Sequence, residues 1–111
     1  MDMPPGFVPE EFYEKKFLFN PYRLSIIRLL MKYPKLSTVE IKNTLDLSWN
    51  TFNSHLLALK NKNFVFIDHT MDEEGMATYV SLQPDALNEF KNLTSMLRLF
   101  LESVHATAQV D

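Results

Sequence analysis

The strongest constraint on the fold lies in residues 45–67, LDLSWNTFNSHLLALKNKNFVFI, where a helical pattern changes to an extended one. Apolar residues recur at Phe52, Leu56 and Leu59, the i, i+4, i+7 spacing of a helix with one buried face. After Asn63, a residue type that tolerates left-handed backbone, the sequence FVFIDHT is rich in β-forming residues. This order predicts a helix over about residues 48–60 that is followed directly by a β-strand.

A second extended segment completes a hairpin. MATYVSL (76–82) is again rich in β-forming residues, and MDEEG (71–75) between the two segments has the composition of a hairpin tip. Pro84 then opens a long amphipathic helix, which we expect to run to about residue 105.

Capping signals predict two further helices before residue 48. Asn20 is a favoured N-cap and Pro21 fits the first helical position, so a helix begins here and ends before Pro34. Ser37 and Glu40 form a capping box that starts a short second helix. The expected buried face of the first helix is Leu24, Ile27, Leu30 and Met31, and the second helix carries the apolar residues Val39, Ile41 and Leu45.

We interpret the chain as three parts. Residues 1–19 form an N-terminal arm with a possible short helix over 10–19, in which Phe12, Leu18 and Phe19 are candidates for docking. Residues 20–83 form a winged helix domain, and residues 84–111 form a C-terminal helix and tail. The predicted fold class is mainly α with a small β-hairpin: a winged helix-turn-helix with a long C-terminal helix.

Composition narrows the function classes. The 111 residues include no cysteine, only two glycines and three dispersed histidines, so we expect no metal site, no cofactor and no enzymatic activity. The sequence also predicts no signal peptide and no membrane span, hence a cytoplasmic protein without a membrane partner. The net charge of −3 argues mildly against nucleic acid, but nine Lys or Arg face only two acidic residues between Lys15 and Lys62.

Residues 20–83 resemble the winged-helix DNA-binding domain of small bacterial and archaeal transcription regulators, the broad MarR and ArsR-like group. The matching stretches are NPYRLSIIRLL (20–30), STVEIKNTLDLSWNTFNSHLLALKNKNFV (37–65) and ATYVSLQPDAL (77–87). The resemblance implies a winged helix that binds double-stranded DNA. Two features depart from it: Asn63 stands in place of the usual glycine before the wing strand, and DEEG replaces the usual basic wing tip. Adjacent carboxylates there would be repelled by the DNA backbone.

The polar start of the helix at 48–60 has the groups that major-groove readers use. Asn can bond adenine through two hydrogen bonds, Ser and Thr contact several bases or phosphates, and flanking lysines fix the register on the duplex. The alternative is a polar face that is merely solvated, and a solvated role is equally open for each lysine, Lys35 included. The predicted DNA-binding set is Lys42, Ser48, Trp49, Asn50, Thr51, Asn53, Ser54, Lys60 and Lys62.

For four residues in or beside this set, the sequence allows either a DNA contact or a contact within the protein. Trp49 could contact sugar or a thymine methyl group, or could lie half buried against the first helix. For His55 we favour helix packing over a phosphate or base contact. Arg23 and Arg28 lie on the first helix, where intrachain ion pairs compete with DNA.

The final helix has an apolar stripe wider than one small domain needs. It either packs only on its own first helix and arm or pairs with a second copy, and we favour pairing because large apolar patches usually mark interfaces. The predicted dimer interface is Leu87, Phe90, Leu93, Leu97, Phe100, Leu101 and Val104.

Together these features predict a homodimeric, sequence-specific double-stranded DNA-binding transcription regulator. Its two helices at 48–60 would enter successive major grooves about 34 Å apart on a pseudo-palindromic site. The alternative is a winged-helix protein–protein interaction module of the transcription machinery, which an acidic wing and a pI near 5.6 would suit. The sequence indicates no particular small-molecule effector.

Overall fold

The computed structural model describes residues 8–109, without the side chains of Asp72 and residues 107–109. Residues 1–7 of the predicted arm and 110–111 of the predicted tail lie outside the described part. The elements in chain order are α1 (Glu10–Glu14), a 3-10 turn η1 (Lys16–Leu18), α2 (Pro21–Lys32), β1 (Leu36–Ser37), α3 (Thr38–Thr44), α4 (Trp49–Asn61), β2 (Val65–Asp72), β3 (Gly75–Leu82) and α5 (Pro84–Gln109). The predicted fold class is therefore confirmed: three helices, a hairpin and a long final helix.

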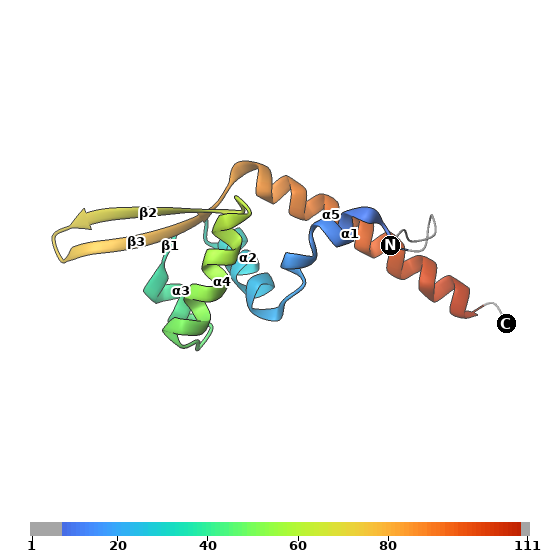
Figure 1. The fold of residues 1–111 in the computed structure, drawn as a ribbon, viewed down its shortest axis with the longest axis horizontal. Helices are drawn as coiled ribbons and strands as arrows, with labels where there is room; N and C mark the ends of the chain where they lie inside the picture. Colours follow the sequence, from blue (N-terminus) through green and yellow to red (C-terminus); the bar gives the residue numbers. More distant parts are fainter. Residues whose placement is uncertain (1–7, 110–111) are drawn as a thin grey trace.

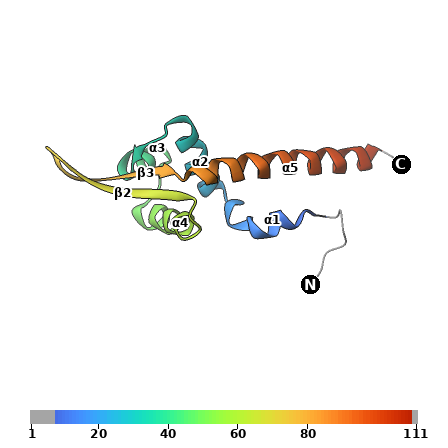
Figure 2. The ribbon, with the colours of Figure 1, turned by 90° about the horizontal axis from the view of Figure 1, so that it is seen from above.

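The molecule is elongated, 64 × 24 × 23 Å. Helices α2, α3 and α4 form a compact body at its centre, from which the β2–β3 hairpin projects in one direction and α5 in the other (Figure 1). Helix α1 follows the side of α5, as both views agree (Figure 2). The hairpin and α5 are thus the two parts that reach furthest from the core.

The predicted caps form as hydrogen bonds. Asn20 Oδ1 accepts from the backbone N–H groups of Tyr22 at 2.9 Å and Arg23 at 3.2 Å. Ser37 Oγ accepts from the N–H of Glu40, whose carboxylate in turn accepts from the N–H of Ser37, so the capping box is complete. Each cap satisfies backbone donors that the first helical turn leaves unpaired. The starts of α2 and α3 are therefore fixed locally.

The core lies between α2, α4 and the sheet. Phe52, Leu56 and Leu59 are buried, as the pattern of α4 predicts. The buried face of α2 differs from the prediction, since Ile26, Ile27 and Leu30 are buried while Leu24 and Met31 are only half buried. Apolar residues lie on both sides of α2, so periodicity alone did not select the inner side.

The apolar residues of α3 differ in burial. Val39 is 51% exposed, whereas Ile41 is fully buried. Residues two positions apart in a helix point in nearly opposite directions, so only one of this pair can face the core. Leu45, at the end of α3, is half buried and packs against the core.

The sheet has three strands in the order β1-β3-β2, all antiparallel. The two-residue strand β1 was not predicted, because so short a segment leaves no periodic pattern; its Leu36 pairs with Val80. The hairpin tip is also narrower than predicted. Met71 pairs with Met76 and Asp72 with Gly75, which leaves only Glu73 and Glu74 in the turn.

The N-terminal arm docks on the body and on α5. Leu18 is fully buried and Phe12 packs against the core, as expected, while Phe19 remains 43% exposed. The Phe12 ring meets the Phe100 ring edge-on at 5.8 Å, and Lys15 Nζ lies 3.3 Å from Glu89 Oε2. Helix α5 continues to Gln109, beyond the predicted end near residue 105.

Candidate nucleic-acid interface

The link between α3 and α4 is a tight turn that sets the direction of α4 relative to α3. Asp46 has a positive φ of 52°, and the N–H of Leu47 donates to the carbonyl oxygen of Lys42 at 3.0 Å. The Leu47 side chain is buried, which anchors the link to the core. Asp is one of the few residues that tolerate this backbone region, so Asp46 makes the tight turn possible. The left-handed residue of this link was not predicted from the sequence.

The first turns of α4 expose three neutral hydrogen-bonding side chains. Asn50, Asn53 and Ser54 are exposed, and the two asparagines form no side-chain hydrogen bond within residues 8–109. Residues 50, 53 and 54 are spaced three and four apart, so they share one side of the helix. Phe52, Leu56 and Leu59 hold the other side in the core. This exposed side has full hydrogen-bonding capacity for a ligand.

Ser48 and Thr51, which also belong to the predicted DNA-binding set, form hydrogen bonds with each other at the N-cap of α4. Ser48 Oγ accepts from the backbone N–H of Thr51 at 3.2 Å and donates to Thr51 Oγ1 at 3.0 Å. The hydroxyl proton of Ser48 is thus engaged, whereas the half-buried Thr51 keeps its own hydroxyl proton for another acceptor. Their direct contribution to a ligand is smaller than that of the exposed asparagines.

Trp49 and Lys42 lie together beside the start of α4. Trp49 is 45% exposed and packs edge-on against Phe52, with ring centroids 6.1 Å apart. The Lys42 ammonium group lies 5.2 Å from the centroid of the Trp49 ring and 3.3 Å from Asn43 Oδ1. The indole therefore packs on its own helix and on a lysine of α3, with half of its surface available to a ligand.

Lys60 and Lys62 are at the far end of α4. Eleven residues separate Lys60 from Trp49, about 16 Å along a helix. Both lysines are exposed, and the Lys62 ammonium group lies 5.8 Å from the centroid of the Phe17 ring in the arm. The predicted DNA-binding set thus forms two groups, one around the start of α4 and one near the arm.

His55 packs between α4 and α2, in line with the favoured interpretation. Its Nδ1 accepts a hydrogen bond from Arg23 Nε at 3.1 Å, and its ring lies 5.3 Å from that of Tyr22. Arg23 Nη1 also donates to the carbonyl oxygen of Phe17 at 2.9 Å. Burial, and secondarily the Arg23 charge, lower the pKa of His55 from its ordinary value. The imidazole is therefore held neutral with its proton on Nε2.

Sequence reasoning missed this Arg23–His55 contact and left Arg23 and Arg28 open between DNA contact and intrachain ion pairs. Neither arginine forms an ion pair within the described part of the chain. A signal was present, since Arg23 and His55 each stand at the edge of an apolar stripe, where the two helices meet.

The wing has the opposite charge to the surroundings of α4. Residues 65–82 include four carboxylates and no Lys or Arg. At the base of the wing, Lys35 Nζ lies 4.0 Å from Asp68 Oδ2 and 5.1 Å from the centroid of the Tyr79 ring. Lys35 is thereby engaged with the wing itself, and the outer half of the hairpin stays acidic.

The predicted interface on α5 divides into an inner and an outer half. Leu93 is buried at 4% exposure, so it serves the chain's own core and offers no surface to a partner. Leu87, Phe90, Leu97 and Phe100 are half buried. Further out, Leu99, Leu101 and Val104 are 60%, 55% and 50% exposed. The outer half of α5 therefore presents apolar side chains that the rest of the described residues do not cover.

Two further classes of site are absent from the described residues. Within residues 8–109 no three His, Cys, Asp or Glu side chains gather where they could bind a metal ion. In the same range no helix combines the length and apolarity that crossing a membrane requires.

Several solved structures share this architecture. A transcriptional regulator homologue from Pyrococcus horikoshii OT3 superposes with a TM-score of 0.76 at 24% identity, over 85% of this chain and 93% of that one. A MarR-family regulator from Enterococcus faecalis V583 gives 0.67 at 13% identity, over 97% and 100%. Overoxidized AbfR bound to DNA gives 0.62 at 18% identity, over 89% and 80%. The chain has the winged-helix fold of MarR-type regulators.

This finding confirms, for the fold, the resemblance seen in residues 20–83. No protein-family model matches the chain, and no curated protein matches it in sequence. At these identities the shared property is the backbone arrangement: a helix-turn-helix, a hairpin wing and a long final helix.

Proposed function

We propose that the protein is a transcription regulator that binds double-stranded DNA and reads the major groove with α4. The observation that carries the proposal is the exposed side of the α4 start, where the amides of Asn50 and Asn53 have no hydrogen-bond partner among the described residues. An asparagine amide can donate to adenine N7 and accept from its N6 amino group in one plane. The αL link at Asp46 and the core beneath α4 hold these amides in place.

Phosphate contacts would come from groups beside the asparagines. The Lys42 ammonium group lies at the start of α4, and the first N–H groups of the helix have no partner within it. Both favour an anion at this end of α4. The AbfR structure, a neighbour in fold, contains bound DNA, which supports the same role for this chain.

We further propose that two copies pair through the outer half of α5. Leu101 and Val104 are exposed and share one side of the helix with Leu97. Burying these side chains against a second α5 would remove apolar surface from water at about 25 cal/mol per Å². A two-fold axis there would present two α4 helices to one duplex, as a pseudo-palindromic site requires.

The DNA proposal is tested by binding to a mixed-sequence duplex at two salt concentrations, followed by selection of a preferred site from a random pool. We expect binding that weakens steeply with salt and a recovered site with two-fold symmetry. Failure to bind any duplex at low salt would instead favour the protein-interaction alternative, which the acidic wing suits.

Pairing is tested separately by sedimentation. The joint change Leu101→Glu and Val104→Glu alters only exposed side chains, so the fold should survive while the dimer is lost. The matched control, Asn92→Glu with Ser95→Glu, adds the same charge at exposed positions on another side of α5 and should remain dimeric. A wild-type monomer at tens of micromolar would contradict pairing through α5.

A further inference from the structure

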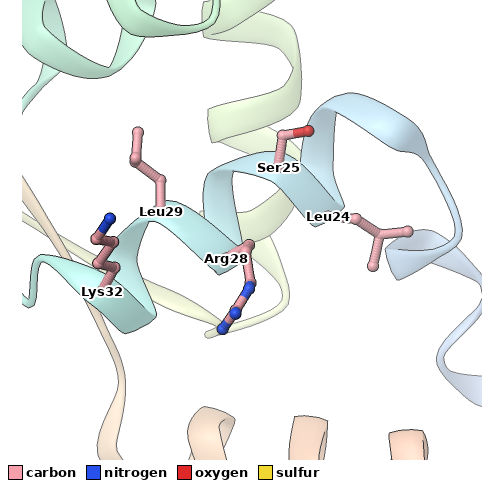
Figure 3. A pocket seen from close by; sticks show the side chains of 5 residues that line it. All are labelled: Leu24, Ser25, Arg28, Leu29 and Lys32. Carbon is pink, nitrogen blue, oxygen red and sulfur yellow. The ribbon is translucent and has the colours of Figure 1, made fainter.

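A shallow hollow of about 520 Å³ lies on the exposed side of α2, lined by Leu24, Ser25, Arg28, Leu29 and Lys32. All five side chains come from one helix, and the charged ends of Arg28 and Lys32 point to opposite sides in the close view (Figure 3). Leu24 and Leu29 are half buried. The hollow therefore combines apolar surface with two flanking cations.

Neither cation is neutralised within the described residues. Arg28 and Lys32 form no ion pair there, and the Lys32 ammonium group only lies 5.4 Å from the centroid of the adjacent Tyr33 ring. An occupant that fits this surface should present apolar side chains and carboxylates together.

The tip of the wing presents this combination. Met71 and Met76 are 70% and 64% exposed and stand directly opposite each other across the hairpin, so they share one face. The turn between their strands is Glu73-Glu74. Methionine side chains are flexible and adapt to irregular apolar surfaces. The wing tip, defined here as residues 71–76, is thus an apolar and acidic surface.

We propose that the wing tip of one copy docks on the α2 hollow of a second copy. The methionines would cover Leu24 and Leu29, and the turn carboxylates would approach Arg28 and Lys32. The strands of the wing are eight residues long, about 26 Å, and lead the tip away from the body of its own chain (Figure 1). The complementary hollow within reach of the tip is therefore that of a neighbour.

This contact differs from α5 pairing in symmetry. The wing of one copy meets α2 of the next, so each copy keeps one unused surface and the contact can repeat. A tip of six residues covers less area than the roughly 1,200 Å² of the smallest stable interfaces, so the contact is weak. It would act between copies already held close together, for example on neighbouring DNA sites, as a source of cooperativity.

The absence of cysteine from the chain permits a direct test that requires neither DNA nor α5 pairing. Met76→Cys and Ser25→Cys variants, mixed in equal amounts under mild oxidation, should form the mixed disulfide, identified by intact mass. The matched control pairs Thr70→Cys with Ser25→Cys, because Thr70 is exposed but lies on the other face of the hairpin. We expect the first pair to form the mixed disulfide at least several-fold faster.

Charge reversal gives an independent readout. Glu73→Lys with Glu74→Lys on the Met76→Cys copy should abolish the advantage over the control. When that charge-reversed copy is mixed with a Ser25→Cys copy that also has Arg28→Glu and Lys32→Glu, the faster disulfide formation should return. Equal rates for the two cysteine pairs, or rates that ignore both charge reversals, would overturn the proposal and leave the wing tip for a partner of another kind.

Discussion

The start of α4 and the wing tip are the two surfaces that this fold presents at its edge, and their chemistry is opposite. Around the start of α4, amide and hydroxyl groups lie beside Lys42, with no carboxylate among the exposed residues 48–54. The wing tip has exposed methionines and carboxylates, and the whole wing lacks Lys and Arg. The difference teaches that the fold sets where ligands can bind, while the side chains decide which ligand each place accepts.

The two surfaces are also expected to differ in how they interact with DNA phosphates. Charges interact over about 8 Å at physiological ionic strength, so carboxylates at the wing tip oppose a close approach of the duplex there. The lysine and the positive end of the helix dipole at the start of α4 favour it. We therefore expect changes at the two surfaces to alter DNA binding in opposite directions.

The largest effect is expected at the asparagines. Asn50→Ala or Asn53→Ala should each cost about 1–3 kcal/mol on the preferred site, because a pair of base-edge hydrogen bonds is lost. Binding to unrelated duplex should change little, since the phosphate contacts survive. Fluorescence anisotropy on both duplexes measures the two affinities.

Asn61→Ala is the matched control for this prediction, because Asn61 is exposed at the other end of the same helix. It should leave both affinities unchanged. Thermal melts must first show that each variant is folded. If folded Asn50 and Asn53 variants keep full discrimination between sequences, α4 does not read bases.

A smaller effect, which does not depend on the DNA sequence, is expected for Lys42→Ala. Loss of one phosphate contact should weaken binding to all sequences alike and reduce the slope of log affinity against log salt by about one. Lys91→Ala on α5 removes the same charge at an exposed position away from α4 and should leave the slope unchanged. Equal slopes for both variants and the wild type would place the phosphates elsewhere.

The wing should respond in the opposite direction. Glu73→Gln with Glu74→Gln removes two negative charges with little change in shape, so affinity for unrelated duplex should rise by less than about tenfold. The matched control is Glu10→Gln with Glu11→Gln on α1, a distant helix. An unchanged affinity would show that the tip stays clear of the duplex, which would leave the wing free for protein contacts.

The two surfaces also differ in how well the sequence predicted them. The start of α4 was predicted closely because Ser48 is a local cap and Phe52, Leu56 and Leu59 form a clear stripe, both encoded within a few residues. Register in the wing depends on pairing between strands, so the hairpin tip was predicted too wide and β1 was missed. Local signals thus specify helices better than they specify partners in a sheet.

Contacts between elements were the least predictable part of the candidate site. The Arg23–His55 hydrogen bond joins residues 32 positions apart, and the sequence indicates only that each borders an apolar stripe. The Lys42–Trp49 contact likewise depends on the angle between α3 and α4, which the positive φ of Asp46 sets. Such angles follow from the packing of the whole core.

The smallest expected effect concerns the pH dependence of stability. It tests whether the Arg23–His55 contact helps to hold α4 against α2. His55 Nδ1 must be unprotonated to accept from Arg23, and burial together with the Arg23 charge lowers its pKa below the ordinary 6.5. Well above pH 6.5 the imidazole is neutral in both the folded and the unfolded chain, so its contribution to stability is fully present. As the pH falls from 6.5 towards the lowered pKa, the unfolded chain binds a proton that the folded chain does not, and stability decreases.

His55→Asn should remove this part of the acid sensitivity, because an amide oxygen can replace Nδ1 as the acceptor and does not titrate. Urea unfolding at pH 7.5 and pH 5.5 measures the difference for the wild type and the variant. His69→Asn, on the exposed wing, should keep the wild-type decline, since His69 contacts Thr78 within the hairpin and lies outside the α2–α4 contact. If His55→Asn loses as much stability on acidification as the wild type, the Arg23–His55 bond does not hold α4, and the position of this helix depends on the apolar core alone.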